Sequence, residues 1–186
     1  MISPDHGGRE EAMKHCALLF LSLAVPCAFA QTAQPADHFA ALRVFEGQWQ
    51  GSSSGKPGTG TTKREYRFVL NGHFLWQHDD SVYQTSDGKS FAHEDEGYFS
   101  YDSNRKQVLW TQFHSEGLVN VYALDSVSDD AKSITFITTE IENLPGFRAK
   151  KHYQVVSPDA IDETFWLAPP GQDFALYTVA HLKRVK

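Results

Sequence analysis

A histidine and three acidic residues follow one another in the run His93-Glu94-Asp95-Glu96. The run lies between two turn signals, and with its aromatic neighbours it has the length and composition of a β-strand. Successive side chains on a strand point to opposite faces, so His93 and Asp95 share one face of this strand. Which face points inward decides whether His93 belongs to a ligand pocket or to a solvated surface.

The face that carries His93 is the more apolar of the two. Phe91, Phe99 and Tyr101 share it, and we therefore expect it to point into a core. This places His93 inside, with Asp95 two residues further along. The alternative is a strand histidine that merely hydrogen-bonds a neighbour, or one that is exposed because the register differs by one residue.

A metal site is the second kind of chemistry that this run could support. Adjacent strand residues point to opposite faces, so His93 and Glu94 cannot bind one ion together. His93 and Asp95 could do so, but a third ligand from another strand would be needed. The sequence therefore predicts no metal site.

Catalytic residues are not predicted elsewhere in the chain. No serine lies in a nucleophile-elbow motif, and no nucleophile, base and orienting group can be placed together. The acidic pairs Asp79-Asp80 and Asp129-Asp130 are expected to be solvated turn or edge residues. Most of the late basic residues, Lys151 among them, are expected at the surface. The sequence does not decide whether the protein is an enzyme, but the lack of a recognisable catalytic set argues against one.

From Gln48 onward the chain is predicted to form β-strands throughout. Segments rich in β-branched and aromatic residues alternate with turn residues, and Asn71-Gly72 is a strong tight-turn signal. Before the strands, Asp37 can cap a short helix at residues 38–45. The expected strands are 48–53, 61–71, 73–84, 90–101, 106–115, 117–125, 132–141, 147–156, 160–168 and 175–185.

This order of elements predicts an all-β fold, an antiparallel up-and-down barrel of about ten strands with a short N-terminal helix. Closure removes the exposed edges of a flat sheet, and a barrel of this size can enclose a small ligand. An open sandwich is the alternative. Residues 37–186 would form this single domain. We expect Phe68, Trp76, Phe99 and Trp110 to point inward, whereas alternation does not decide the direction of His114, which shares a face with Trp110.

The first thirty residues are predicted to be removed from the mature protein. Residues 13–30 have the positive start, apolar centre and Ala-Phe-Ala cleavage site of a secretory signal peptide. Residues 1–12 fit an over-extended start, and 31–36 a polar linker. The mature protein is therefore expected to be exported, either to the periplasm or outside the cell.

Composition narrows the classes of partner. The formal net charge is −6, and no basic cluster predicts a nucleic-acid surface. No second apolar run predicts stable membrane insertion after cleavage. Both cysteines, Cys16 and Cys27, lie in the segment to be removed, so thiol catalysis and thiolate ligation are excluded in the mature form. The oligomeric state is left open.

Five motifs in order give the chain a family resemblance. It resembles the nitrobindin-like, haem-binding β-barrel group of the calycin superfamily and its bacterial secreted relatives. The resemblance covers nearly all of the mature chain, and the order and spacing of the motifs carry it. The motifs are FEGQWQG (45–51), REYRF (64–68), FAHEDEGYF (91–99), EGLVNVY (116–122) and YTVAHLKR (177–184).

The resemblance implies a position for haem and departs from the family at the iron ligand. In haem-binding members a histidine matching His93 lies beside the haem, and a closing-strand histidine coordinates the iron. That second position falls on Tyr177 here. A tyrosinate can ligate haem iron, but it needs a basic partner to lower its pKa of about 10. His181 lies about 13 Å further along the strand, at roughly 3.3 Å per residue.

Three functions follow from these observations. The favoured one is a secreted or periplasmic calycin-like barrel that binds a small, mainly apolar ligand. The alternatives are a haem-binding, nitrobindin-like protein that acts on reactive nitrogen species, and a structural or interaction barrel with a filled interior. No cofactor is predicted apart from the haem that the resemblance implies, with Tyr177 as its iron ligand. The candidate pocket residues are His93, Tyr177, Trp110, Phe99, Trp76, Phe68 and His114.

Overall fold

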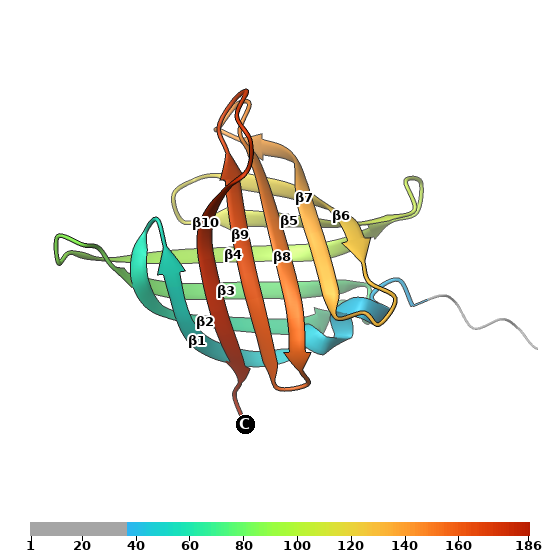
Figure 1. Ribbon diagram of the computed structural model, residues 1–186. Helices are drawn as coiled ribbons and strands as arrows, with labels where there is room; N and C mark the ends of the chain where they lie inside the picture. The colour runs from blue at the N-terminus through green and yellow to red at the C-terminus, as the bar shows by residue number, and fades with distance from the viewer. Residues whose placement is uncertain (1–36) are drawn as a thin grey trace, which may run out of the picture. The chain divides into compact units, whose positions relative to one another are not determined.

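A closed antiparallel β-barrel of ten strands makes up the part of the chain that the structure, a computed structural model, describes, residues 37–186 (Figure 1). The predicted signal peptide (13–30) and linker (31–36) lie outside these residues. Within 37–186, no helix has both the length and the apolar character needed to cross a membrane.

Each strand pairs with the next one along the chain, and the last strand pairs with the first, so the sheet has no free edge. The predicted all-β up-and-down barrel is therefore confirmed, and the open sandwich is excluded. The strands are β1 (Gly47–Gly55), β2 (Gly58–Val69), β3 (Phe74–Gln84), β4 (Ser90–Asp102), β5 (Gln107–His114), β6 (Val119–Val127), β7 (Ser133–Glu142), β8 (Arg148–Ser157), β9 (Ala160–Ala168) and β10 (Ala175–Arg184).

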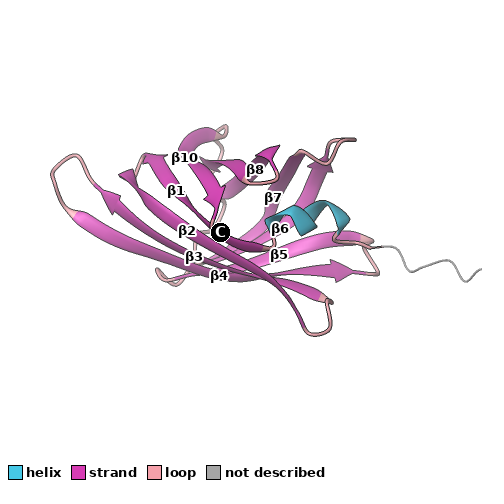
Figure 2. Cartoon of the chain, turned by 90° about the horizontal axis from the view of Figure 1, so that it is seen from below, coloured by secondary structure: helices cyan, strands magenta, loops and turns pink. Residues whose placement is uncertain are grey.

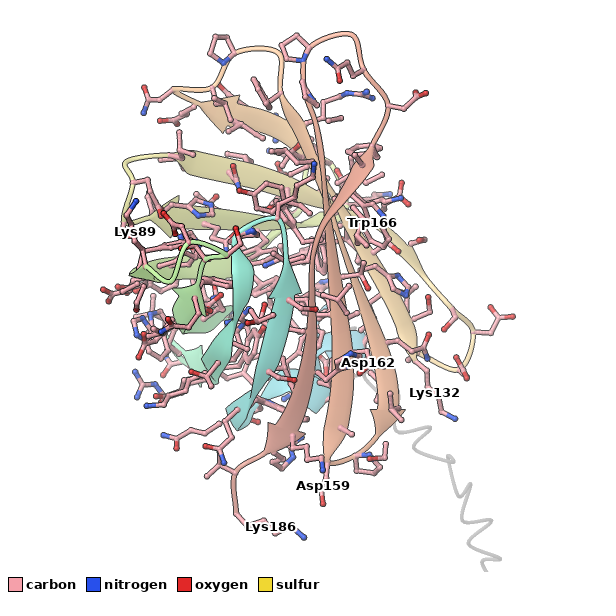
Figure 3. All side chains as sticks on the ribbon, turned by 60° about the vertical axis from the view of Figure 1, so that its left-hand side comes forward. Lys89, Lys132, Asp159, Asp162, Trp166 and Lys186 are labelled. Carbon is pink, nitrogen blue, oxygen red and sulfur yellow. The ribbon has the colours of Figure 1, made fainter. Side chains whose placement is uncertain are left out.

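Alternation along the strands separates the inner from the outer face. On β4 the even-numbered Glu94 and Glu96 are exposed, whereas Asp95 and Phe99 are buried inside the barrel, as the sequence predicts. On β9 the outward-facing residues include Asp162 and Trp166, which Figure 3 labels on the surface of the sheet. The period of two therefore decides which polar residues reach the interior.

A short 3-10 helix, η1 (Ala40–Phe45), lies against the barrel near one end (Figure 2). The backbone N–H of Phe39, just before it, donates a hydrogen bond to Asp37 Oδ1 at 3.1 Å. Leu42 and Phe45 are buried, and the ring of Phe45 lies 4.7 Å from that of Tyr153. The helix therefore belongs to the hydrophobic core.

The first and last strands are tied to η1 by Trp49 and Arg184. The indole N–H of Trp49 donates to the carbonyl of Phe45 at 2.7 Å, and the Arg184 guanidinium lies 4.2 Å from the centre of the Trp49 ring. Arg184 Nη2 also donates to the carbonyl of Val44 at 2.8 Å. These contacts fix the closing strand to the start of the barrel.

Large aromatic side chains fill the half of the interior that adjoins η1. Phe99 and Trp110 are fully buried and stack with their ring centres 4.8 Å apart. Trp110 stacks in turn on Tyr122 at 4.7 Å, and Phe136 packs edge-on against both Phe99 and Trp110. An open space remains inside the barrel on the side of this packed layer that is away from η1.

Candidate functional site

A cavity of about 270 Å³ occupies the half of the barrel beyond the aromatic layer. Part of its wall is apolar, formed by Leu118, Ile141, Leu144, Phe165 and Leu167. The rest is polar, and most of its charged side chains come from β2, β3, β4, β5, β8 and β9. The cavity therefore has two chemically different sides.

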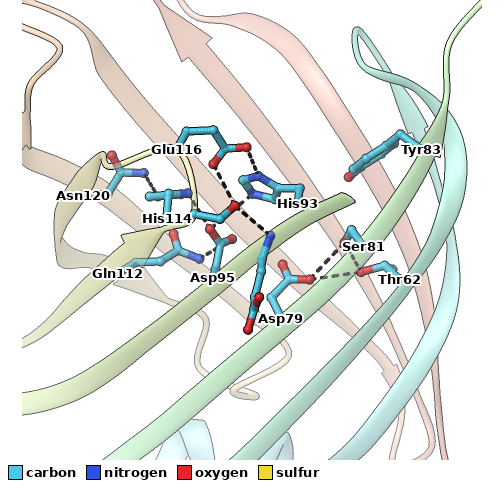
Figure 4. Close-up of polar contacts among 12 residues, drawn as sticks. Thr62, Asp79, Ser81, Tyr83, His93, Asp95, Gln112, His114, Glu116 and Asn120 are labelled. Carbon is cyan, nitrogen blue, oxygen red and sulfur yellow. Dashed lines mark hydrogen bonds and ion pairs between the residues drawn. The ribbon is translucent and has the colours of Figure 1, made fainter. Parts of the chain in front are cut away.

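The polar side contains a cluster built from β4 and β5. His93 and Asp95 lie on the inner face of β4, and Asp95 is directly opposite His114 in the β4–β5 pair. Figure 4 shows the two imidazoles converging on the Asp95 carboxylate, with Glu116 on the far side of His93. The strand register therefore brings His114 next to His93 and Asp95, which lie nineteen or more positions before it in sequence.

Short contacts hold this cluster. His93 Nε2 lies 3.2 Å and His114 Nδ1 2.5 Å from Asp95 Oδ1. The other carboxylate oxygen of Asp95 accepts a hydrogen bond from Gln112 Nε2 at 3.0 Å. His93 Nδ1 is 2.7 Å from Glu116 Oε1, a spacing that fits an N–H donating to the carboxylate.

These neighbours change the proton affinities of the cluster. Burial alone lowers the pKa of His93, but the carboxylates of Asp95 and Glu116 outweigh it and raise that pKa to about 9. Burial raises the pKa of Asp95, and the two histidines lower it by more, so its pKa is held below the usual range. In the absence of another cation, Asp95 is therefore a carboxylate beside a protonated His93.

A second buried cluster is formed by side chains from β2, β3, β8 and β9. Arg64 on β2 forms an ion pair with Asp79 on β3, and its Nη2 lies 3.3 Å from Glu163 Oε1 on β9. Lys151 Nζ on β8 is 3.3 Å from the same oxygen. Ser81 donates a further hydrogen bond to Asp79 at 3.0 Å, drawn in Figure 4. All of these side chains are buried.

The basic residues of the second cluster lower the pKa of Glu163. Burial raises the pKa of Glu163, but the positive charges of Arg64 and Lys151 outweigh it and lower that pKa to about 2. Lys151 Nζ also lies 5.1 Å from the centre of the Trp110 ring, within the range of a cation–π contact. The cluster therefore pairs two acidic side chains with two basic ones inside the barrel.

Three of the seven residues predicted for the pocket line the cavity, namely His93, His114 and Tyr177. Phe99 and Trp110 point inward but belong to the packed aromatic layer. Phe68 packs against η1, with its ring 6.0 Å from that of Phe39.

Trp76 does not face the interior. It lies on the outer face of β3, where its indole N–H donates to Glu96 Oε1 at 2.8 Å and the Arg67 guanidinium covers its ring at 4.8 Å. Its neighbours Leu75 and Gln77 are the inward residues, so the expected inward position of Trp76 is corrected. Tryptophan is amphipathic, so its large ring alone does not predict which face of a strand it occupies.

Four buried charges of the second cluster were missed or misplaced. The expectation that Asp79 is solvated is wrong, although Asp80 is exposed, and Lys151 is the buried exception among late basic residues expected mostly at the surface. Strand alternation carries the missing signal. Arg64 shares its face with Tyr66, and Glu163 shares its face with Ile161 and Phe165. A charge on an apolar strand face is therefore the pattern that marks these positions.

Fold and cavity together define an antiparallel ten-stranded β-barrel whose interior cavity has one apolar and one polar side. The chain is similar to the crystal structure of Rv2717c from M. tuberculosis, with a TM-score of 0.60 and 19% sequence identity over 81% of this chain and 99% of that one. At this identity the likeness shows the fold. No protein-family model matches the chain. No curated protein sequence matches it either.

Proposed function

We propose that the barrel binds a small molecule with an apolar body and one hydroxyl-like polar group in its cavity. The observation that carries this proposal is the two-sided lining of the cavity. Leu118, Ile141 and Phe165 can cover an apolar body, while polar groups face them across the space. Ligand sites commonly combine a mainly apolar wall with a few orienting polar groups.

The polar groups that remain accessible define the chemistry of the ligand. Glu116 has 48% of its side chain exposed and His93 has 25%, and Tyr177 is half-buried beside them. A hydroxyl group can donate to the Glu116 carboxylate and accept from the Tyr177 phenol at the same time. A hydroxyl group therefore suits both side chains, whereas an anionic group would be repelled by the Glu116 carboxylate.

The size of the cavity supports a small ligand. Its volume of about 270 Å³ lies just below the lower end of the range of about 300–1,000 Å³ for pockets that hold drug-sized molecules. The filled-interior alternative describes only the half of the barrel that holds Phe99 and Trp110. The open half supports binding over a purely structural role.

Haem, the cofactor that the family resemblance implies, fits these residues poorly. Burial raises the pKa of Tyr177, and the nearby Tyr83 and Glu116 raise it further. A tyrosinate ligand needs the opposite change, because the phenol must lose its proton to bind iron. A cavity of about 270 Å³ is also small for a macrocycle. We therefore derive no function through haem. Export of the protein remains a prediction from the signal-peptide pattern of residues 13–30.

Titration with 2-phenylethanol, followed by amide chemical shifts in the presence of a chelator, tests this function. We expect saturable shifts at Leu118, Ile141 and Phe165. Phenylacetate, which replaces the hydroxyl by an anion, is expected to bind at least tenfold more weakly.

A matched pair of variants locates the binding. Leu118→Trp places a large ring at the cavity wall, and Val82→Trp places the same ring on the outer face of β3, where Val82 is 40% exposed. We expect the first variant to weaken binding at least tenfold and the second to leave it unchanged. Absence of saturable shifts in the unmodified protein, or equal binding by both variants, would overturn the proposal.

A further inference from the structure

We propose that His93, Asp95 and His114 form a binding site for one divalent transition-metal ion on the wall of the cavity. Each residue offers one ligand atom, and the three atoms lie within 4.8 Å of one another. Two imidazoles and one carboxylate are the ligands that zinc and ferrous iron accept in sites that keep a coordination position open. This inference goes beyond the proposed function, because the ion needs no ligand in the cavity.

The register of the sheet makes the site from regular strands. His93 and Asp95 are two residues apart on the inner face of β4, and His114 faces Asp95 from β5. The third ligand therefore comes from another strand, which is the condition that the β4 motif alone could not meet. Ligands on paired strands are held more precisely than ligands on loops.

The distances fit an ion with modest adjustment. His93 Nε2 and His114 Nδ1 lie 3.2 and 2.5 Å from Asp95 Oδ1. Ligand atoms around a tetrahedral zinc ion are about 3.3 Å apart, given bond lengths of about 2.0–2.1 Å. The His93 pair already has this spacing, and the His114 pair must widen by less than 1 Å.

The three proposed ligands meet at Asp95 Oδ1. This oxygen is buried and accepts no well-aligned hydrogen bond among residues 37–186, while His93 Nε2 and His114 Nδ1 approach it at 3.2 and 2.5 Å. A metal ion placed between the three ligand atoms would coordinate this oxygen.

Each proposed ligand has a partner behind it. Glu116 Oε1 lies 2.7 Å from His93 Nδ1, and Gln112 Nε2 donates to Asp95 Oδ2 at 3.0 Å. Such outer contacts orient ligands and set the tautomer of a metal-bound histidine. With its Nδ1 proton donated to Glu116, His93 presents the lone pair of Nε2 to the ion.

Asn120 is the outer hydrogen-bond partner of His114. Its amide lies 2.8 Å from His114 Nε2 and 3.1 Å from the Tyr122 hydroxyl. Metal binding through Nδ1 leaves the proton on Nε2, so the Asn120 amide then turns its oxygen toward the ring. The Tyr122 hydroxyl can donate to the same oxygen, so this arrangement satisfies all three groups.

The charge of the cavity also matches a divalent ion. Its lining holds the acidic side chains of Asp79, Asp95, Glu116 and Glu163 and the basic side chains of Arg64 and Lys151. Metal binding requires neutral histidines, and the four acids then outnumber the two bases by two, which matches the charge of one divalent ion. The open coordination position faces the cavity and would hold water or an oxygen atom of a ligand.

Calorimetric titration of the purified, chelator-treated chain with Zn²⁺ tests the site. We expect one equivalent to bind, and His114→Gln to weaken this binding at least a hundredfold. His181→Gln is the matched control, because His181 also faces a carboxylate, Asp162 at 2.7 Å, but its side chain is 64% exposed on the outside of β10. It should leave the one-equivalent binding unchanged. Glu116→Gln, which removes only an outer partner, should weaken it about tenfold to a hundredfold.

A measurement on the unmodified protein keeps the test decisive if His114→Gln fails to fold. Imidazole nitrogen chemical shifts should change on Zn²⁺ addition for His93 and His114 and not for His181. Absence of a one-equivalent binding step, or a response confined to His181, would overturn the metal site. Binding of 2-phenylethanol is measured with chelator present, so either proposal can fail while the other stands.

Discussion

Asp95 on β4 and His114 on β5 face each other across the inner wall of the barrel, with Oδ1 and Nδ1 2.5 Å apart. The two residues are directly opposed in the strand register, so their contact follows from the pairing itself. It joins the polar wall of the cavity to the β4 motif that contains His93. The chemistry of the cavity therefore depends on how β4 and β5 pair.

Asp79 and Asp80 are adjacent in sequence and are expected to differ strongly in their effect on stability. Asp79→Asn removes one of the two carboxylates that pair with the buried Arg64, whereas Asp80 is exposed on the outer face. Breaking a buried ion pair on one side typically costs about 3–5 kcal/mol, and surface changes lie within about 0.5 kcal/mol. Urea unfolding of Asp79→Asn and of Asp80→Asn measures the difference between their free energies of unfolding. Equal free energies of unfolding would contradict the buried ion pair.

Acid is expected to destabilise the barrel through Glu163. Its pKa is about 2 in the folded protein and 4.5 as the reference value, so the unfolded chain binds the proton first as pH falls. The stabilisation is complete above about pH 4.5 and is lost as pH falls toward about 2, on the order of 3 kcal/mol in all. The stability difference between the unmodified protein and Glu163→Gln should therefore shrink between about pH 7 and about pH 3. A difference that stays constant over this range, with exposed Glu140→Gln as control, would contradict the assignment.

Haemin is expected to bind only non-specifically. The raised pKa of Tyr177 keeps its phenol protonated, and the cavity is small. Mixing the protein with haemin should therefore give no sharpened Soret band, and Tyr177→Phe should give the same spectrum as the unmodified protein. A sharp band that is lost in Tyr177→Phe would restore the haem alternative.

Arg184 is expected to stabilise the closed end of the barrel. Arg184→Met removes the cover of the Trp49 ring and the hydrogen bond to the Val44 carbonyl. Hydrogen bonds from charged groups contribute about 1.5–3 kcal/mol, so we expect a loss of about 2 kcal/mol in the free energy of unfolding. Arg105→Met changes a 69% exposed side chain and is the control. Thermal unfolding with equal midpoints for both variants would show that Arg184 does not tie η1 to the barrel.

The strands and the inward direction of His93 could be predicted because both depend on local patterns. Turn residues mark the ends of the strands, and Phe91 and Phe99 mark the inward face of β4, where Phe91 lines the cavity and Phe99 is buried. The partner of Asp95 could not be predicted in the same way. Its position depends on the register between β4 and β5, and a shift of one residue would turn His114 outward.

The buried charges show a second limit of sequence reasoning. Arg64 and Glu163 are 99 residues apart in sequence, and they meet inside the barrel because its closure leaves only β1 and β10 between β2 and β9. Alternation can place each one on an inner face, but only closure of the sheet shows that opposite charges compensate there. Trp76 illustrates the converse, because a large aromatic side chain packs on the outer face.

A crystal structure of the protein soaked with 2-phenylethanol tests whether the barrel binds a small alcohol. We expect one molecule inside the barrel, with its ring against Phe165 and its hydroxyl group within hydrogen-bond distance of Glu116 or Tyr177, all of which line the cavity. An empty cavity, or a molecule found only on the outer face of the sheet at full soaking concentration, would contradict the proposed function.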